Sequence, residues 1–175
     1  MSCNTTLTSI IKGCENNAGG LKKVYIAPLA SITEITSLEG TVSNIEMEEG
    51  SNYVEYDFNK DSANYIEEAG IDLVNGSTFF TTTLSLNIKR REVAKRNSIA
   101  LLAGGQIDLS IIVLDSNGKY WLIGETGANL TGLGEGSGSV KADGSKYSLT
   151  FVAEEMDMIP EVDKTLFPDL LSPAV

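Results

Sequence analysis

The sequence predicts a mainly β fold: a sandwich or barrel of about seven or more strands, with one α-helix and extended terminal arms. Three observations lead to this class. Apolar and polar residues alternate in several short segments, as they do on a strand with one buried face. Turn residues such as those of Asn75-Gly76 separate these segments. One further stretch carries apolar residues at helical spacing.

Two segments show the alternation most clearly. In residues 78–89 one face consists of Phe80, Thr82, Leu84, Leu86 and Ile88. In residues 53–58 one face consists of Val54, Tyr56 and Phe58, and the other of Tyr53, Glu55 and Asp57. The longer segment is also rich in β-branched residues, which favour strands. Further strands are predicted at 21–27, 40–47, 107–114, 119–125 and 146–154.

The choice between strand and helix stays open for residues 31–38 and 61–70. In the second stretch, one alternative is a short helical turn capped by Asp61 or Ser62, with Glu67 and Glu68 exposed.

The one helix is predicted over about residues 91–103. Its helical spacing comes from Val93, Asn97, Ala100 and Leu101, and Gly104-Gly105 supplies the stop. We expect this helix to cover an open end or one face of the β layer, with Lys95 and Arg96 toward solvent.

The chain divides into an N-terminal arm (1–20), a β domain (21–155) and a C-terminal arm (156–175). The first arm is polar and holds both cysteines, Cys3 and Cys14, which we expect to be free thiols. The second arm needs a partner for its apolar residues, either the surface of this domain or a neighbouring subunit. These residues are Met156, Met158, Ile159, Leu166, Phe167, Leu170 and Leu171.

The composition excludes several classes of chemistry. The chain has no histidine, which removes the usual general base and the commonest metal ligand. Acidic residues cluster at 45–50, 66–70 and 153–157, without a companion motif, and are interpreted as solvated faces. We therefore expect no enzyme and no catalytic, cofactor-binding or metal site. No run of apolar residues is long enough to span a bilayer and no signal peptide is evident, so we expect no membrane partner.

Two loops resemble ligand-binding motifs but have simpler interpretations. Asp115, Asn117 and Gly118 echo the start of a calcium loop, but a strand pattern follows, so a hairpin turn with positive φ angles at Asn117-Gly118 is favoured. The glycine-rich run 127–145 precedes another strand and not a helix, which favours a mobile loop over a dinucleotide site.

Charge is unevenly distributed along the chain. The net charge is −11, yet residues 77–105 carry five basic residues against Glu92 alone. This basic spot consists of Lys89, Arg90, Arg91, Lys95 and Arg96. It is interpreted either as an interface with an acidic patch on another copy of the chain or as a solvated helix start with local ion pairs. The apolar residues Leu166, Phe167, Leu170 and Leu171 are the other candidate subunit contacts.

The order of sequence blocks over residues 19–155 resembles a family of small virion structural proteins from tailed phages and prophages of the Bacteroidetes, including crAss-like phages. The blocks are GGLKKVYIAPLASIT, YVEYDFNKDSANY, NGSTFFTTTLSLNI, a helix ending LLAGG, DSNGKYWLIGE, a glycine-rich loop and YSLTFVAEE.

The resemblance implies a tail tube subunit: two packed sheets and one helix, with copies, six in related tubes, closing a ring around a β-barrel channel. The implied partners are further copies, other virion proteins, and DNA only in passage; the implied location is the virion, after synthesis in the host cytoplasm. A head-decorating or connector protein is the alternative. A β-sandwich that binds carbohydrate or peptide through Trp121 or Tyr120 stays open as a different class, although Trp121 lies in an apolar strand and is expected in the core.

Overall fold

The structure is a computed structural model that describes residues 7–167 and 169–171. Its elements in chain order are β1 (Leu21–Pro28), η1 (Leu29–Ser31), β2 (Ile32–Leu38), β3 (Thr41–Met47), β4 (Val54–Glu55), β5 (Ala63–Asp72), β6 (Ser77–Lys89), α1 (Val93–Gly105), β7 (Leu109–Asp115), β8 (Tyr120–Gly136), β9 (Lys146–Glu155), β10 (Glu161–Val162) and η2 (Lys164–Leu166). The prediction of a mainly β fold with one helix is confirmed within this range.

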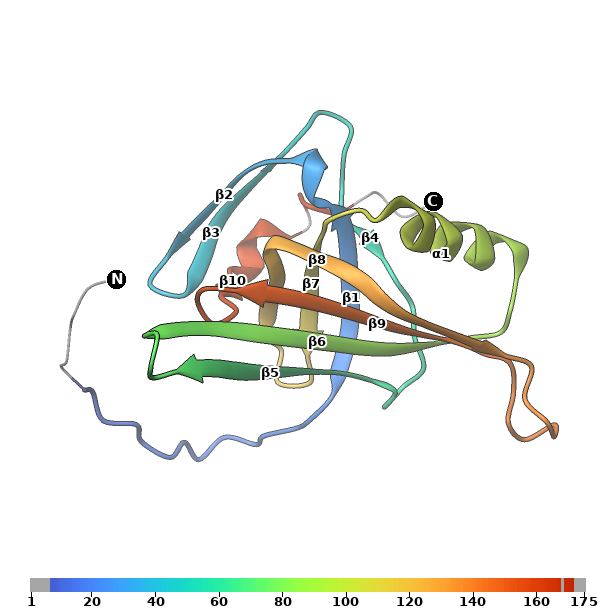
Figure 1. Ribbon diagram of the computed structural model, residues 1–175, viewed down its shortest axis with the longest axis horizontal. Helices are drawn as coiled ribbons and strands as arrows, with labels where there is room; N and C mark the ends of the chain where they lie inside the picture. The colour runs from blue at the N-terminus through green and yellow to red at the C-terminus, as the bar shows by residue number, and fades with distance from the viewer. Residues whose placement is uncertain (1–6, 168, 172–175) are drawn as a thin grey trace.

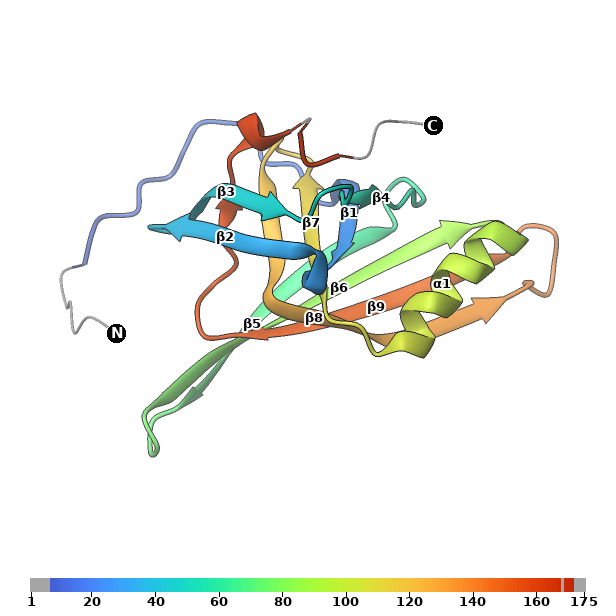
Figure 2. The same ribbon diagram turned by 90° about the horizontal axis from the view of Figure 1, so that it is seen from above.

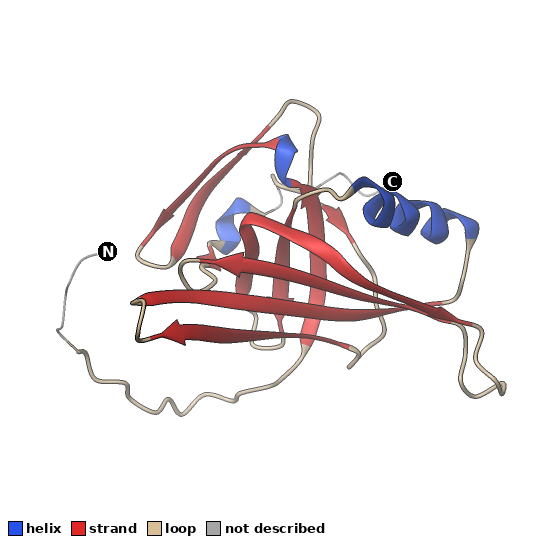
Figure 3. Cartoon of the chain, viewed as in Figure 1, coloured by secondary structure: helices blue, strands red, loops and turns tan. Residues whose placement is uncertain are grey.

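The strands form one curled sheet with two parts that share β8. One part has the order β2-β3-β10-β8-β7-β1-β4, and the other continues from β8 through β9 and β6 to β5. In Figure 1 the long strands β5, β6 and β9 lie across β1 and β7, so the two parts form crossed layers. Figure 2 shows the same layers from above, and Figure 3 shows how little of the chain is helical.

A bulge in β8 makes the turn from one layer into the other. The pairing with β7 jumps from Ile111↔Ile123 to Leu109↔Ala128, which leaves residues 124–127 outside the ladder. Gly124 has φ +81°, and a Cβ there would lie 2.6 Å from the carbonyl oxygen of Leu109. Only glycine fits both the backbone conformation and the close approach at this corner.

Two hydrophobic clusters lie on opposite faces of β1 and β7. The first fills the space between the crossed layers and includes Val24, Ile111, Leu84 and Phe151. The second lies behind β1 and β7 and includes Ile112. Because β7 is buried on both faces, its sequence is nearly all apolar and does not alternate, with Ser110 as the one buried polar residue.

The long strand β6 follows the predicted alternation. Thr82, Leu84, Leu86 and Ile88 are buried, and Phe80 on the same face is half-buried. The two faces predicted for residues 53–58 are also observed, although the regular strand there is shorter than predicted.

In that stretch only Val54–Glu55 forms a strand, with Tyr53 buried and Val54 exposed. Tyr53 faces the second cluster, and Tyr56 and Phe58 pack against the first, because successive side chains of this stretch point to opposite faces of the sheet. The open choices resolve as strands: residues 61–62 complete a turn and 63–70 belong to β5, and 31–38 begins at the end of η1 and continues as β2.

The helix begins and ends close to its predicted bounds but buries a different face. Ile99 is buried and Leu102 half-buried, whereas Val93 and Leu101 are exposed. Of the two cations predicted toward solvent, Arg96 is exposed, and Lys95 is half-buried. The Lys95 ammonium donates a hydrogen bond to the carbonyl oxygen of Lys89 at 2.9 Å.

The glycine-rich run is only partly a loop. Residues 127–136 belong to β8, which pairs with β9 as far as Gly136↔Lys146, and residues 137–145 form the loop. Glycines at alternate positions lack side chains on one face of this strand, and side chains of β9 come close there. A Cβ at Gly132 would lie only 3.1 Å from the Cβ of Thr150.

The two ends of the chain differ. Residues 7–20 are exposed throughout and extend away from the sheet (Figure 1). The C-terminal segment folds back instead: β10 pairs with both β3 and β8, and Leu171 bridges to Tyr53.

Candidate functional site

The long strands present a polar face that no other described element covers. On β6 and β9 the residues between the buried positions are half-buried and mostly short and polar. They are Thr81, Thr83, Ser85, Asn87, Ser148, Thr150 and Val152. We call this surface the long-strand face. In Figure 1 it faces the viewer.

The long-strand face ends at an unpaired edge. All ten residues of β5 pair with β6, and no described strand pairs with the other side of β5. The strand contains no proline and no lysine, the residues that commonly protect exposed edges from other chains. This edge can therefore accept a strand from another molecule.

The hairpin between β5 and β6 ends in an ordered but apolar tip. The Asp72 carboxylate accepts hydrogen bonds from the backbone nitrogens of Val74 and Asn75 at 2.9 and 3.1 Å. Hydrogen bonds from the Asn75 side chain, and then from these backbone groups, lower the pKa of Asp72. Leu73 and Val74 are 90% and 93% exposed at this tip, so a defined turn holds two unburied apolar side chains.

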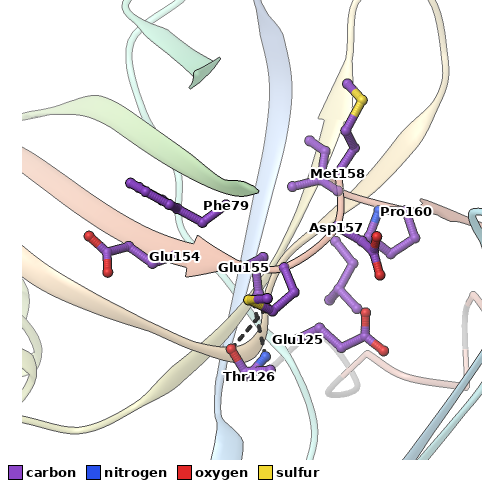
Figure 4. Close-up of a pocket in the computed structure, with 11 residues that line it drawn as sticks. Phe79, Glu125, Thr126, Glu154, Glu155, Asp157, Met158 and Pro160 are labelled. Carbon is purple, nitrogen blue, oxygen red and sulfur yellow. Dashed lines mark hydrogen bonds between the residues drawn. The ribbon is translucent and has the colours of Figure 1, made fainter. Parts of the chain in front are cut away.

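A groove opens beside the start of β6, where β9 ends and the chain turns toward β10 (Figure 4). We call it the acidic groove. Its volume is about 420 Å³, and its lining residues are Phe79, Leu122, Glu125, Thr126, Glu154, Glu155, Met156, Asp157, Met158, Ile159 and Pro160. Phe79, Met156 and Met158 are 43%, 65% and 62% exposed, so the groove has an unburied apolar lining.

Four carboxylates surround this apolar lining. Glu155 accepts hydrogen bonds from the backbone and hydroxyl of Thr126 at 3.0 and 2.8 Å, and Glu125 accepts one from Ser37 at 3.2 Å. The side-chain carboxylates of Glu154 and Asp157 have no hydrogen-bond or ion-pair partner among the described residues. No lysine or arginine lines the groove, so its potential is negative.

Phe79 is held in place by a glycine on the neighbouring strand. Gly70 pairs with Phe79, and a Cβ at Gly70 would lie 2.3 Å from the ring. The ring therefore covers bare backbone at the hairpin, and Phe79 lines the groove from the β6 side (Figure 4).

The five residues of the basic spot come together where β6 ends and α1 begins. Glu92 forms ion pairs with Arg90 at 3.2 Å and with Lys95 at 3.3 Å. The Arg91 guanidinium lies 5.6 Å from the centre of the Tyr147 ring, and Lys89 pairs in register with Lys146. Local ion pairs therefore exist as the simpler interpretation expects. A subunit interface at this spot stays a prediction.

The apolar C-terminal residues are held by this chain's own second cluster. Leu170 is buried, and Leu166, Phe167 and Leu171 are half-buried. The Phe167 ring stacks on Tyr120, with ring centres 4.4 Å apart. Burial of this segment needs no second subunit, and a further role of these residues in subunit contacts stays a prediction.

The Asp115–Gly118 segment is a hairpin turn, as predicted, but of another type. Gly118 has φ +85°, whereas Asn117 is not among the residues with positive φ. The Asp115 carboxylate accepts hydrogen bonds from the backbone nitrogens of Asn117 and Lys119. This pattern is a tight turn closed by one left-handed glycine.

Trp121 follows this turn and packs against the first cluster, and its indole nitrogen donates to Asp115 at 3.3 Å. Since Tyr120 stacks on Phe167, both rings proposed as carbohydrate platforms are engaged within the chain.

The remaining predicted features lie apart from one another. Of the acidic stretches, 153–157 lines the groove. Stretch 66–70 reaches its rim through Glu67, whose carboxylate accepts a hydrogen bond from the backbone nitrogen of Ile159 at 2.8 Å, and 45–50 lies at the end of β3. Cys14 is free and exposed, and Cys3 lies outside the described residues.

Over the described range, no group of acidic or cysteine side chains has the geometry of a metal site. No helix there is long and apolar enough to cross a membrane.

The chain matches no protein-family model, and no curated protein sequence matches it significantly. The sequence predictions missed the acidic groove and the unpaired edge. The only available signal was the absence of lysine and arginine from residues 61–88 and 147–163, which contain β5, β6 up to Lys89 and β9 after Lys146.

Proposed function

We propose that this chain is a structural subunit of a tailed-phage virion, and specifically a tail tube subunit whose copies close into a ring around a DNA channel. The observation that carries the proposal is the long-strand face with its unpaired edge on β5. Pairing of this edge with a neighbouring copy extends the sheet from one subunit to the next. Closure of such a sheet into a ring turns its uncovered face into a channel wall.

The chemistry of the long-strand face suits a wall that DNA passes. Between its ends the face carries hydroxyl, amide and small apolar groups, with no basic side chain on β6 before Lys89. Phosphates are held by lysine and arginine, so this surface offers them no binding partner. The net charge of −11 adds a repulsive field.

The two ends of the long strands are complementary in charge, which supports stacking of rings. Lys89 and Lys146 pair at one end, next to the rest of the basic spot. Glu68 and Glu154 lie opposite the same residue, Thr81, at the other end, near the apolar hairpin tip. A positive end of one copy therefore fits the negative end of the next, head to tail.

Negative-stain electron microscopy of the full-length protein at high concentration tests the assembly. Rings or stacked tubes with an open channel are expected. Rings that never stack favour the connector alternative, and a species that stays monomeric at every concentration contradicts the proposal.

A matched pair of lysine substitutions tests the edge and the wall separately. Ile66 on β5 and Thr83 on β6 are register partners on the same face, but only Ile66 lies on the unpaired strand. Ile66→Lys should prevent ring formation, because lysine on an edge strand opposes pairing with another chain. Thr83→Lys should still assemble and should retain DNA, which wild-type rings release. If both variants lose assembly, or if both still assemble, the assignment of the β5 edge as the contact between copies is overturned. Rings of Thr83→Lys that release DNA as wild-type rings do overturn the wall assignment.

A further inference from the structure

We propose that residues 7–12 of one copy bind in the acidic groove of a second copy. The inference rests on the self-assembly in the proposed function, and it names one contact between copies. It requires no particular ring size, and it applies to any homo-oligomer of this chain.

The first argument is that residues 7–12 are apolar and unsupported. Leu7, Ile10 and Ile11 are 95%, 100% and 84% exposed, and none of them joins either hydrophobic cluster. Thr8, Ile10 and Ile11 are β-branched and favour a strand conformation. A solvent-exposed strand-like segment of this composition requires a partner to bury it.

The second argument is that the chain anchors this segment only at its base. The backbone nitrogen of Ala18 donates to the Asn117 side chain at 2.8 Å, and the Ser116 hydroxyl donates to the carbonyl oxygen of Gly20 at 3.0 Å. Residues 7–14 make no hydrogen bond to the rest of the described chain. In extended form the arm spans roughly 3.3 Å per residue, so it reaches well beyond its own domain.

The third argument is complementarity between the segment and the groove. The groove offers the exposed surfaces of Phe79, Met156 and Met158, which match isoleucine and leucine side chains. Its carboxylates Glu154 and Asp157 have no partner within the described residues, and Lys12 is the only charged residue in 7–14. A bound arm therefore covers the apolar lining and brings one cation to a negative rim.

The occupant is a second copy because the single chain leaves both surfaces open. No residue of 7–12 lines the groove of its own molecule, and Figures 1 and 2 both show the arm running out from the body. Exchange between copies lets each arm satisfy a neighbour's groove. Repeated around a ring, a contact of modest affinity becomes strong through multivalency.

Disulfide trapping in the full-length chain tests this contact. Cys3 and Cys14 are first replaced by serine. One chain then carries Ile11→Cys and a second, distinguished by a tag, carries Met158→Cys. Mild oxidation of the mixture should link the two different chains. The control replaces Met158→Cys with Leu101→Cys, a residue 67% exposed on α1, and should give little linkage. Equal linkage with both partners overturns the proposal.

Two further outcomes locate a failure. A chain carrying both Ile11→Cys and Met158→Cys that links only within itself, at every concentration, shows the arm in its own groove and overturns the second copy as occupant. Rings seen by electron microscopy without arm-to-groove linkage leave the proposed function standing and remove this contact. Linkage in small oligomers without rings supports the arm-to-groove contact and contradicts the proposed ring assembly.

A charge exchange tests the ionic part. Lys12→Glu in the arm or Asp157→Lys in the groove should each lower the yield of linked chains about three- to tenfold. The two changes combined in opposite chains should recover most of the yield. Failure of the combination to recover linkage overturns the pairing of Lys12 with the groove carboxylates.

Discussion

The N-terminal segment, residues 7–16, and the C-terminal segment, residues 158–171, both lie outside the long strands, yet their relations to the core are opposite. Each carries several apolar residues. The C-terminal segment buries Ile159, Val162 and Leu170, whereas every residue of the N-terminal segment is exposed.

Backbone partners account for this difference. The C-terminal segment continues the ladder: the nitrogen of Glu161 donates to Gly40, that of Leu122 to Pro160, and that of Tyr53 to Leu170, each at 2.8 to 3.0 Å. These bonds satisfy polar groups of the segment and hold Val162 and Leu170 against the second cluster, while Ile159 packs in the first. The N-terminal segment has no strand beside it. Apolar content alone therefore does not decide which end joins the core.

Deleting each end in turn gives the largest expected contrast. Removal of residues 159–175 should cost about 5 kcal/mol or more, because three buried apolar side chains leave the core and uncover their neighbours. Removal of residues 1–15 should change the free energy of unfolding by less than about 0.5 kcal/mol. Urea denaturation followed by Trp121 fluorescence measures both. Similar losses from the two deletions would show that the N-terminal segment also belongs to the fold.

Single substitutions sharpen the same contrast. Leu170→Ala should destabilise the chain by about 2 to 4 kcal/mol, because Leu170 is 6% exposed and its truncation leaves a cavity in the second cluster. Ile10→Ala, at a side chain that is 100% exposed, should leave the urea midpoint unchanged. A midpoint shift from Ile10→Ala as large as that from Leu170→Ala would refute the assignment of the two ends.

High pH should loosen the C-terminal attachment. Burial raises the pKa of Tyr53 to about 12, while its hydrogen bond with Ser110 acts in the opposite direction. Since the folded-state pKa exceeds that of the unfolded chain, this stabilisation is complete below about pH 10 and is lost as the pH rises through 12. The loss is about 2 to 3 kcal/mol.

Tyr53 bridges to Leu171, so the second cluster should open first. Unfolding free energies measured from pH 9 to 12 should fall less steeply for Tyr53→Phe. An equal slope for the two proteins would exclude Tyr53 as the source.

The smallest effect on stability is expected at the exposed apolar tip. Leu73→Ser should change the unfolding free energy by less than about 0.5 kcal/mol, since Leu73 is 90% exposed. Sedimentation velocity should nevertheless show weaker association, because the tip is one of the surfaces offered to other copies. Unchanged association would remove the tip from the assembly.

Local patterns predicted most of the β structure. The alternation in residues 78–89 identified the buried face of β6, and Gly118 identified the turn between β7 and β8. The face of α1 was mispredicted because its apolar residues surround the helix, and only contact with the sheet selects Ile99 over Leu101.

The candidate surfaces were predicted less well. The five residues of the basic spot lie close together in the sequence, so the sequence identified them. It did not decide between a subunit interface and the local ion pairs that two of them form with Glu92. The acidic groove joins residues from β6, β8 and β9 that are up to 81 positions apart, from Phe79 to Pro160. No local pattern reports such a meeting.

The sequence by itself determined the β class, the single helix, the acidic charge and the lack of histidine chemistry, because these follow from local periodicity and composition. The tertiary structure alone decided which apolar end is buried, where β8 bends, and which sheet edge stays unpaired. These depend on register between distant strands, and backbone hydrogen bonding between such strands carries no local sequence signature.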